Sequence, residues 1–156
     1  MIDELFGELE YKLGFNGKTK ISLFEKEWDL RLKINTDEDE IIKPSQRKVF
    51  SEYLENKEEI MSEVEDKIYN YYLSMFEEYR AMREEDKDEI ALIIYDKNEL
   101  AKLIEPITLL IDYDFEDGSA QRWGFVMETI WEPSHGLGVL IQNNEITKVG
   151  YADVIL

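Results

Sequence analysis

The residues best suited to chemistry gather in the stretch 131–139, which reads WEPSHGLGV. It contains the single histidine of the chain, His135, with Glu132 and Ser134 close by. An imidazole, a carboxylate and a hydroxyl are the groups that general acid–base and nucleophilic catalysis use. Neighbours in sequence seldom reach the geometry of a triad, because the base must face its nucleophile across the fold. We therefore predict that His135 forms hydrogen bonds that hold the loop in shape, and a His/carboxylate enzyme is the alternative.

Proline and glycine in the same stretch predict a tight connection between two strands. Pro133 restricts the backbone, and Gly136 permits a sharp turn. Gly138 predicts a bulge or the close approach of another backbone segment. The two glycines do not form a dinucleotide-binding motif, because they open a strand rather than a helix. The candidate functional loop consists of Trp131, Glu132, His135, Gly136 and Gly138.

A second group of carboxylates occupies residues 112–117, just before a glycine. It superficially resembles a calcium loop, but an EF-hand needs Gly at position 6 and Glu at position 12, where this chain has aspartate and tryptophan. A turn between two strands explains these residues, because Asp and Gly suit turn geometry. We predict no metal site and no cofactor. A metal-dependent enzyme that combines His135 with Asp112 and Asp114 is the alternative.

Negative charge is the strongest overall property of the chain. Its 156 residues include 36 Asp and Glu against 18 Lys and Arg, a net charge of −18. Such a field opposes binding to nucleic acid and to anionic membranes, and it attracts basic proteins or cations. Residues 36–89 contain 18 acids and 8 bases. The candidate partner-binding acidic face is Asp37, Glu38, Asp39, Glu40, Glu58, Glu59, Glu63 and Asp66. The plainer alternative is that the charge only keeps the protein soluble.

Composition excludes several classes of protein. The absence of cysteine excludes disulfide frameworks, thiol catalysis and Cys-type zinc sites, and one histidine cannot form a multi-His metal site. No apolar run approaches the roughly 18 residues that span a membrane, and the N-terminus lacks the pattern of a signal peptide. Hydrophobic residues make up 44% and aromatic residues 12% of the chain, which is typical of a folded protein. We expect a cytoplasmic protein with a single domain over residues 1–156.

The N-terminal half predicts strands followed by two helices. Residues 28–35 alternate apolar and polar with period two, which indicates a strand with one buried face. Asn16 and Gly17 predict the turn of a hairpin. Pro44 suits the first turn of a helix over residues 44–55, and the acidic run 37–40 before it is expected to be a solvated loop. Asn56 with Glu59 predicts a capping box that opens a second helix, which ends near residue 82.

The C-terminal half predicts mainly strands. A short helix begins at Asp96 or Asn98 and ends before Pro106. Strands are expected at residues 107–113, 121–131, 137–142 and 145–149, with a short final strand in 151–156. The order of strands, helices and strands indicates an α+β fold. We predict a largely antiparallel sheet, built from an N-terminal meander and the C-terminal strands, with two or three helices packed on one face.

The chain resembles an uncharacterised bacterial domain family with the signature W-D-x-E-H-G-x-G-V, a V-G-x-x-D ending and a P-x-Q helix start. The matching residues are Trp131, His135, Gly136, Gly138, Val139, Val149, Gly150, Asp153, Pro44 and Gln46. Glu132 replaces the family's Asp and Ser134 replaces its Glu, so those two carboxylates do not form a fixed site. The resemblance implies an α+β domain without a known activity. Some relatives look like immunity components found near secreted toxins.

These observations favour a non-catalytic protein-interaction module, of an immunity-like kind, that binds a basic partner protein through its acidic face. The enzyme that uses residues 131–139 is the first alternative. A small oligomeric module, monomer or homodimer, is the second. In the homodimer, Ile155, Leu156 and the aromatic face of the sheet would form the contact if an edge strand is left free.

Overall fold

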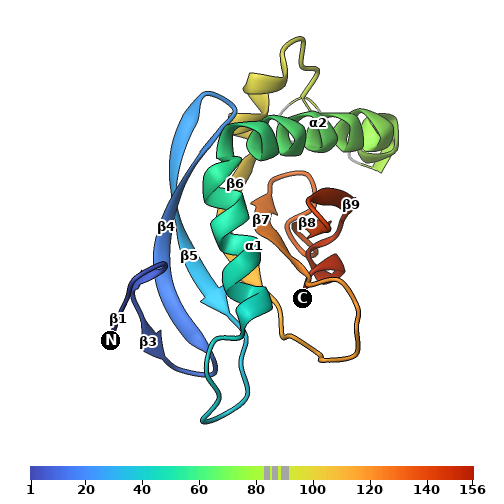
Figure 1. Cartoon of the computed structure of the whole chain (residues 1–156). Coiled ribbons are helices and arrows are strands. Elements are labelled where there is room, and N and C mark those ends of the chain that lie inside the picture. The colour runs from blue at the N-terminus through green and yellow to red at the C-terminus, as the bar shows by residue number, and fades with distance from the viewer. Residues whose placement is uncertain (83–84, 86–87, 89–91) are drawn as a thin grey trace.

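The computed structural model describes residues 1–82, 85, 88 and 92–156 (Figure 1). Seven strands form one sheet in the order β3-β4-β5-β6-β7-β8-β9, and β1 (Ile2–Asp3) pairs with β2 (Gly7–Glu8) separately. The seven are β3 (Glu10–Tyr11), β4 (Phe15–Leu23), β5 (Lys26–Ile34), β6 (Ile104–Ile111), β7 (Trp123–Thr129), β8 (Leu137–Gln142) and β9 (Glu145–Gly150). Strands β5 and β6 are parallel, and the other described pairs are antiparallel. The predicted α+β class with a largely antiparallel sheet is confirmed.

The long hairpin β4–β5 turns at a different place from the one predicted. Asn16 and Gly17 lie inside β4, opposite Lys33 and Leu32 of β5, so the predicted turn there was wrong. The turn residues are Phe24 and Glu25, with φ values of 53° and 59°.

Positive φ is uncommon for residues with a side chain, but burial compensates for it at this turn. The Phe24 ring is 2% exposed, and its backbone N–H donates to the Glu65 carboxylate across 2.6 Å. Sequence preference at Asn16 and Gly17 is overridden because a turn there would take β4 away from the core that Ile21 and Leu23 enter.

Helix α1 (Pro44–Glu55) has the predicted bounds and α2 (Lys57–Met82) follows almost directly. The backbone N–H of Lys43 donates to the Gln46 side-chain oxygen at 2.9 Å, which satisfies this N–H at the start of α1. The predicted capping box at Asn56 was not found in that form. The Asn56 side chain donates instead to the Glu52 carbonyl at 2.9 Å, so it closes α1. No helix in the described part of the chain is long and apolar enough to span the bilayer.

Both helices belong to the crossover that joins the parallel strands β5 and β6, and they cover one face of the sheet (Figure 1). Tyr53 of α1 packs against Trp123 and Phe125 of β7, with ring centroids 5.3 Å and 6.4 Å away. Tyr72 of α2 packs against Trp131, with centroids 5.0 Å apart. These aromatic contacts between the helices and the sheet lie in the main core.

The last residues cover the opposite face of the sheet. The predicted final strand was wrong: residues Ala152–Val154 form the short 3-10 helix η2, and Ile155 is fully buried against Leu110 and Leu140. Gly138 of β8 explains the close fit, because a Cβ there would come within 2.8 Å of the Tyr151 carbonyl oxygen. The predicted close approach of backbone at Gly138 is thus confirmed.

Pro106 was expected to end a helix, but it lies inside β6 opposite Met127. The register shifts between Pro106 and Thr108, and such a bulge accommodates a residue without an N–H. The short helix before it is the 3-10 helix η1 (Lys97–Lys102), which Asp96 caps as predicted. The charged residues 83–89 also predict a solvated loop or helix end, but residues 83, 84, 86, 87 and 89 lie outside the described residues.

Candidate functional site

The loop that contains His135 is held tightly to its surroundings. The His135 Nδ1 atom lies 2.9 Å from the Glu132 Oε1 atom. The imidazole stacks on the Tyr151 ring, with centroids 4.5 Å apart and planes inclined by 18°. The backbone carbonyl of His135 accepts a hydrogen bond from the Ala152 N–H at 2.9 Å. These contacts fasten the C-terminal segment over the sheet, which agrees with the predicted role of His135 in holding the loop.

Two further residues of this loop are fixed by packing and backbone geometry. The Trp131 side chain is 1% exposed and lies between Tyr72 and Tyr79. Gly136 has a φ of +63°, and a Cβ there would come within 2.7 Å of the Met127 carbonyl oxygen. Its N–H donates to the Glu132 carbonyl at 2.9 Å. The loop is a closed turn rather than a concave site.

The structure does not bring Asp112 and Asp114 to His135. The aspartates follow β6, beside the start of β7, whereas His135 follows the end of β7. A strand of 7 residues separates the two loops by about 20 Å. In the described part of the chain, no group of three or more His, Asp or Glu side chains could hold a metal ion.

The eight residues of the predicted acidic face are exposed, but they fall into two groups. The run Asp37–Glu40 precedes α1, and Glu58, Glu59, Glu63 and Asp66 lie on α2 beyond the other end of α1. A helix of 12 residues separates the groups by about 18 Å. The residues of the predicted acidic face therefore form two separate groups on the surface.

The carboxylates of the first group meet a different partner, the loop after β6. Together the two loops line a cavity of about 390 Å³, which we call the acidic cavity. It lies at the carboxyl ends of the two parallel strands, beside the start of α1. Its lining residues are Asn35, Thr36, Asp37, Glu40, Lys43, Gln46, Tyr113, Asp114, Phe115 and Glu116. Crevices outside the carboxyl ends of parallel strands are common places for ligands.

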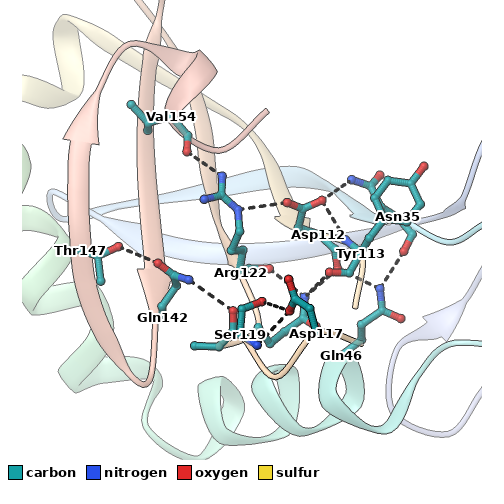
Figure 2. Close-up of polar contacts among 12 residues, drawn as sticks. Asn35, Gln46, Asp112, Tyr113, Asp117, Ser119, Arg122, Gln142, Thr147 and Val154 are labelled. Atoms are coloured by element: carbon teal, nitrogen blue, oxygen red, sulfur yellow. Dashed lines mark hydrogen bonds and ion pairs between the residues drawn. The ribbon is translucent and has the colours of Figure 1, made fainter. Parts of the chain in front are cut away.

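Gln46 holds the floor of the acidic cavity in place. Its side chain is fully buried, and its amide nitrogen donates to the carbonyls of Asn35 at 2.7 Å and Asp112 at 2.9 Å. These two carbonyls follow the ends of β5 and β6, so one side chain ties both strand ends to α1 (Figure 2). The Gln46 side-chain oxygen accepts from Lys43, which completes its hydrogen bonds.

A network around Asp112 stiffens the same corner, as Figure 2 shows. Its carboxylate accepts from the Arg122 guanidinium at 3.2 Å, from the Asn35 amide at 3.3 Å and from the Tyr113 N–H at 2.8 Å. Arg122 also donates to the Val154 carbonyl at 3.0 Å. The predicted calcium-like loop is thus a turn whose first aspartate is occupied by protein partners.

Opposite this floor, the acidic cavity is lined by charged and aromatic side chains that a ligand would contact. The Lys43 ammonium bridges the loops, 2.8 Å from a Glu40 oxygen and 3.3 Å from a Glu116 oxygen. Hydrogen bonds to these two carboxylates raise the pKa of Lys43. The aromatic rings of Tyr113 and Phe115 are 37% and 56% exposed. Carboxylates beside exposed rings can accept and stack on an organic cation.

Sequence reasoning missed most of this site. Tyr113 and Phe115 alternate with acids in residues 112–117, and exposed aromatic rings inside a polar turn were the available signal. Thr36 gave no signal. It is 6% exposed, and its hydroxyl has no hydrogen-bond partner among the described residues. Gln46 was noted only as part of the family resemblance.

Part of the surface that the homodimer alternative named is covered within this chain. Ile155 belongs to a core cluster on the sheet, and Trp123 and Phe125 of the aromatic face pack under α1. Leu156 remains 75% exposed.

Comparisons with known proteins identify a family whose description names no activity. No curated protein and no solved structure matches this chain. A family model, described as Domain of unknown function (DUF6985), matches residues 5–156. The predicted resemblance to an uncharacterised domain family is confirmed by this match. Because it spans nearly the whole sequence, the chain belongs to the Domain of unknown function (DUF6985) family.

Proposed function

We propose that this protein is an interaction module whose acidic cavity receives a lysine or arginine side chain from a basic partner protein. The observation that carries the proposal is the lining of the cavity, where four carboxylates and two exposed aromatic rings surround a single ammonium group. An immunity-type protein that occupies a basic surface of a toxin is one form of this proposal.

The chemistry of the lining fits a guanidinium group well. Arginine presents five donors in a plane, which suits carboxylates on two facing loops. Asp37 is exposed, and its carboxylate has no ion-pair partner among the described residues. The exposed face of Phe115 offers a stacking surface for the same cation. The unpaired Thr36 hydroxyl adds a further polar group to the wall.

Lys43 provides an internal example of the contact. Its ammonium lies between Glu40 and Glu116, at the ends of two loops that are far apart in the sequence. A cation from the partner would compete with Lys43 or join it, because each carboxylate can accept more than one hydrogen bond. The net charge of −18 would accelerate the encounter and make the association rate depend on salt.

The test measures binding of a fluorescein-labelled GRGRGRG peptide by anisotropy at low and high salt. A double variant, Asp37→Asn with Glu116→Gln, removes two charges from the acidic cavity. A matched control, Glu59→Gln with Glu63→Gln, removes two charges from α2. We expect the cavity variant to weaken binding by about tenfold or more and the control by about twofold.

Two results would overturn the proposal. Equal losses in the cavity variant and the α2 control would mean that the peptide responds only to overall charge. Absence of binding to the unaltered protein at low salt would mean that the acidic surface has no affinity for cationic peptides. Phe115→Ala adds a readout that is independent of charge, because it removes the stacking surface and leaves every carboxylate in place.

A further inference from the structure

The cations of this acidic protein are concentrated in the β4–β5 hairpin. Residues 12–33 contain six Lys and Arg against three Asp and Glu, whereas the rest of the chain has 12 bases against 33 acids. The six are Lys12, Lys18, Lys20, Lys26, Arg31 and Lys33. The hairpin is therefore a positively charged region at one border of a negatively charged molecule.

The outer edge of β4 is open. Strand β3 pairs with β4 only at Phe15 and Asn16, and Glu8 of β2 lies beside Gly17. From Lys18 to Leu23, no described strand pairs with β4 on that side. In Figure 1, the upper part of β4 forms the border of the molecule, whereas β1 and β3 lie outside its lower part. An open strand edge presents backbone groups that can pair with another chain.

The turn determines which residues of β4 present those groups. A two-residue turn with positive φ at Phe24 and Glu25 makes Leu23 a hydrogen-bonded partner of β5. The alternate residues Lys18, Lys20 and Ser22 then direct their N–H and C=O groups away from β5. Their side chains are exposed as well.

In the described part of the chain, Lys18 and Arg31 are the unpaired cations beside this edge, whereas Lys20 is paired with Glu27 and Asp29 of β5 at 3.4 Å and 3.6 Å. Lys18 lies directly opposite Arg31, and neither has an anionic partner among the described residues. Like charges in directly opposite positions destabilise a strand pair. Arg31 also lowers the pKa of Lys33, although the main cause of that shift is desolvation. An open hollow of about 760 Å³ lies over residues 17–20 and 29–31.

We propose that the free edge of β4 binds an extended segment of a partner protein with Asp or Glu at alternate positions, which adds to the sheet as a further strand. Charge complementarity selects this occupant. A second copy of β4 would bring Lys18 and Lys20 against identical lysines, and a basic strand would meet the same repulsion. An acidic strand would instead neutralise the unpaired charges of Lys18 and Arg31.

The probe is an acetylated EVEVEV peptide amide, with KVKVKV as its matched control. Binding is followed by anisotropy, and amide hydrogen exchange identifies the contact. We expect only the acidic peptide to bind, and we expect exchange to slow by about tenfold or more at the amides of Lys18, Lys20 and Ser22. The net charge of −18 opposes this peptide, so its binding requires a local site.

Variants separate charge from backbone pairing. Lys18→Glu should abolish binding of EVEVEV, whereas Lys148→Glu, an exposed lysine on the opposite edge strand β9, should leave it within about twofold. Ser22→Pro removes one outward N–H without changing charge and should weaken binding by about tenfold. Circular dichroism checks that each variant is folded.

Three outcomes would overturn the proposal: equal binding of both peptides, exchange protection away from β4, or full affinity in folded Ser22→Pro. If Ser22→Pro does not fold, Lys18→Glu and the exchange pattern still decide. This proposal does not depend on the acidic cavity, because the arginine peptide that tests the cavity and the acidic peptide carry opposite charges.

Discussion

The loops at the two ends of β7 differ in composition and in the space that they enclose. At one end, residues 112–117 border the acidic cavity, with the Phe115 ring 56% exposed and carboxylates along the wall. At the other end, residues 131–136 enclose no space: Trp131 is 1% exposed, and His135 is stacked on Tyr151. The loop that contains the residue types used in catalysis holds the C-terminal segment in place, as predicted, and the loop that was predicted to be only a turn borders a cavity.

The difference shows that the types of residue in a loop identify a binding site less reliably than the presence of a cavity beside them. His135 and Glu132 are close enough for acid–base work, but their remaining contacts hold the chain together. The carboxylates after β6 gain a role because the 37–40 loop faces them from another part of the chain. The predictions below test this contrast between a structural loop and a binding loop.

The largest expected effect is on stability, at Trp131. Trp131→Ala removes a buried ring that contacts Tyr72 and Tyr79, and we expect it to lower the free energy of unfolding by about 3–5 kcal/mol. Phe115→Ala at the cavity should change it by less than about 0.5 kcal/mol, because that ring is exposed. Urea denaturation measures both. If the two substitutions lowered the free energy of unfolding by similar amounts, the distinction between a structural loop and a binding loop would be contradicted.

A smaller loss in the free energy of unfolding is expected at Gln46, which forms the floor of the acidic cavity. Gln46→Leu leaves the Asn35 carbonyl without its donor and removes one of the two donors of the Asp112 carbonyl, which should cost about 1–3 kcal/mol. Gln142→Leu is the matched control. It removes a bond to the Ala120 carbonyl at 3.3 Å and a long bond from the Thr147 hydroxyl at 3.5 Å, and it should cost less than about 1 kcal/mol. A Gln46 variant as stable as this control would show that the cavity floor does not need the amide.

Acid should weaken the contact that anchors α1 to the N-terminal segment. Arg47 donates two hydrogen bonds to Asp3 and lowers the pKa of that carboxyl from 3.8 to about 2. Because the folded pKa is depressed, the stabilisation is present above pH 3.8 and is lost as the pH falls toward 2. Asp3→Asn should therefore cost about 1 kcal/mol at pH 6, and the gap to the unaltered protein should close between pH 4 and pH 2.

Urea denaturation of both proteins across this pH range provides the measurement. A gap between them that stays constant down to pH 2 would contradict the assigned role of the Asp3 carboxylate.

The smallest effect is expected at His135. His135→Ala removes the contact with the Glu132 carboxylate and a stacked ring, so the free energy of unfolding should fall by about 0.5–1 kcal/mol. Hydrogen exchange at Ala152 should accelerate, because its N–H donates to the His135 carbonyl in the same turn. An unchanged exchange rate at Ala152 would contradict the role of His135 in holding the C-terminal segment. His135 would then again be a candidate for acid–base chemistry.

Local patterns predicted the elements well. The bounds of α1 follow from Pro44 and the apolar spacing, and β8 follows from a short apolar run between two turns. The turn at Asn143 and Asn144 was also correct, with φ values of 52° and 61°. Each of these depends on residues that are near one another in the chain.

The errors arose where distant residues decide the outcome. Phe24 turns the hairpin because Glu65, 41 positions away, accepts its N–H. Pro106 stays in β6 because the neighbouring strand tolerates a bulge. The acidic cavity needs Asp37 and Glu116 to approach, and this depends on the parallel pairing of β5 with β6, which no local pattern encodes.

The parallel pairing also has a consequence for synthesis of the chain. Residues 31–34 of β5 pair with residues 108–111 of β6, so this edge of β5 has no strand partner until about 70 further residues have left the ribosome. At 5–20 residues per second, the interval is about 4–15 s. During it, the apolar face of a completed hairpin is exposed to other nascent chains. Aggregation during translation, rather than unfolding of the finished protein, is therefore the hazard that this topology creates.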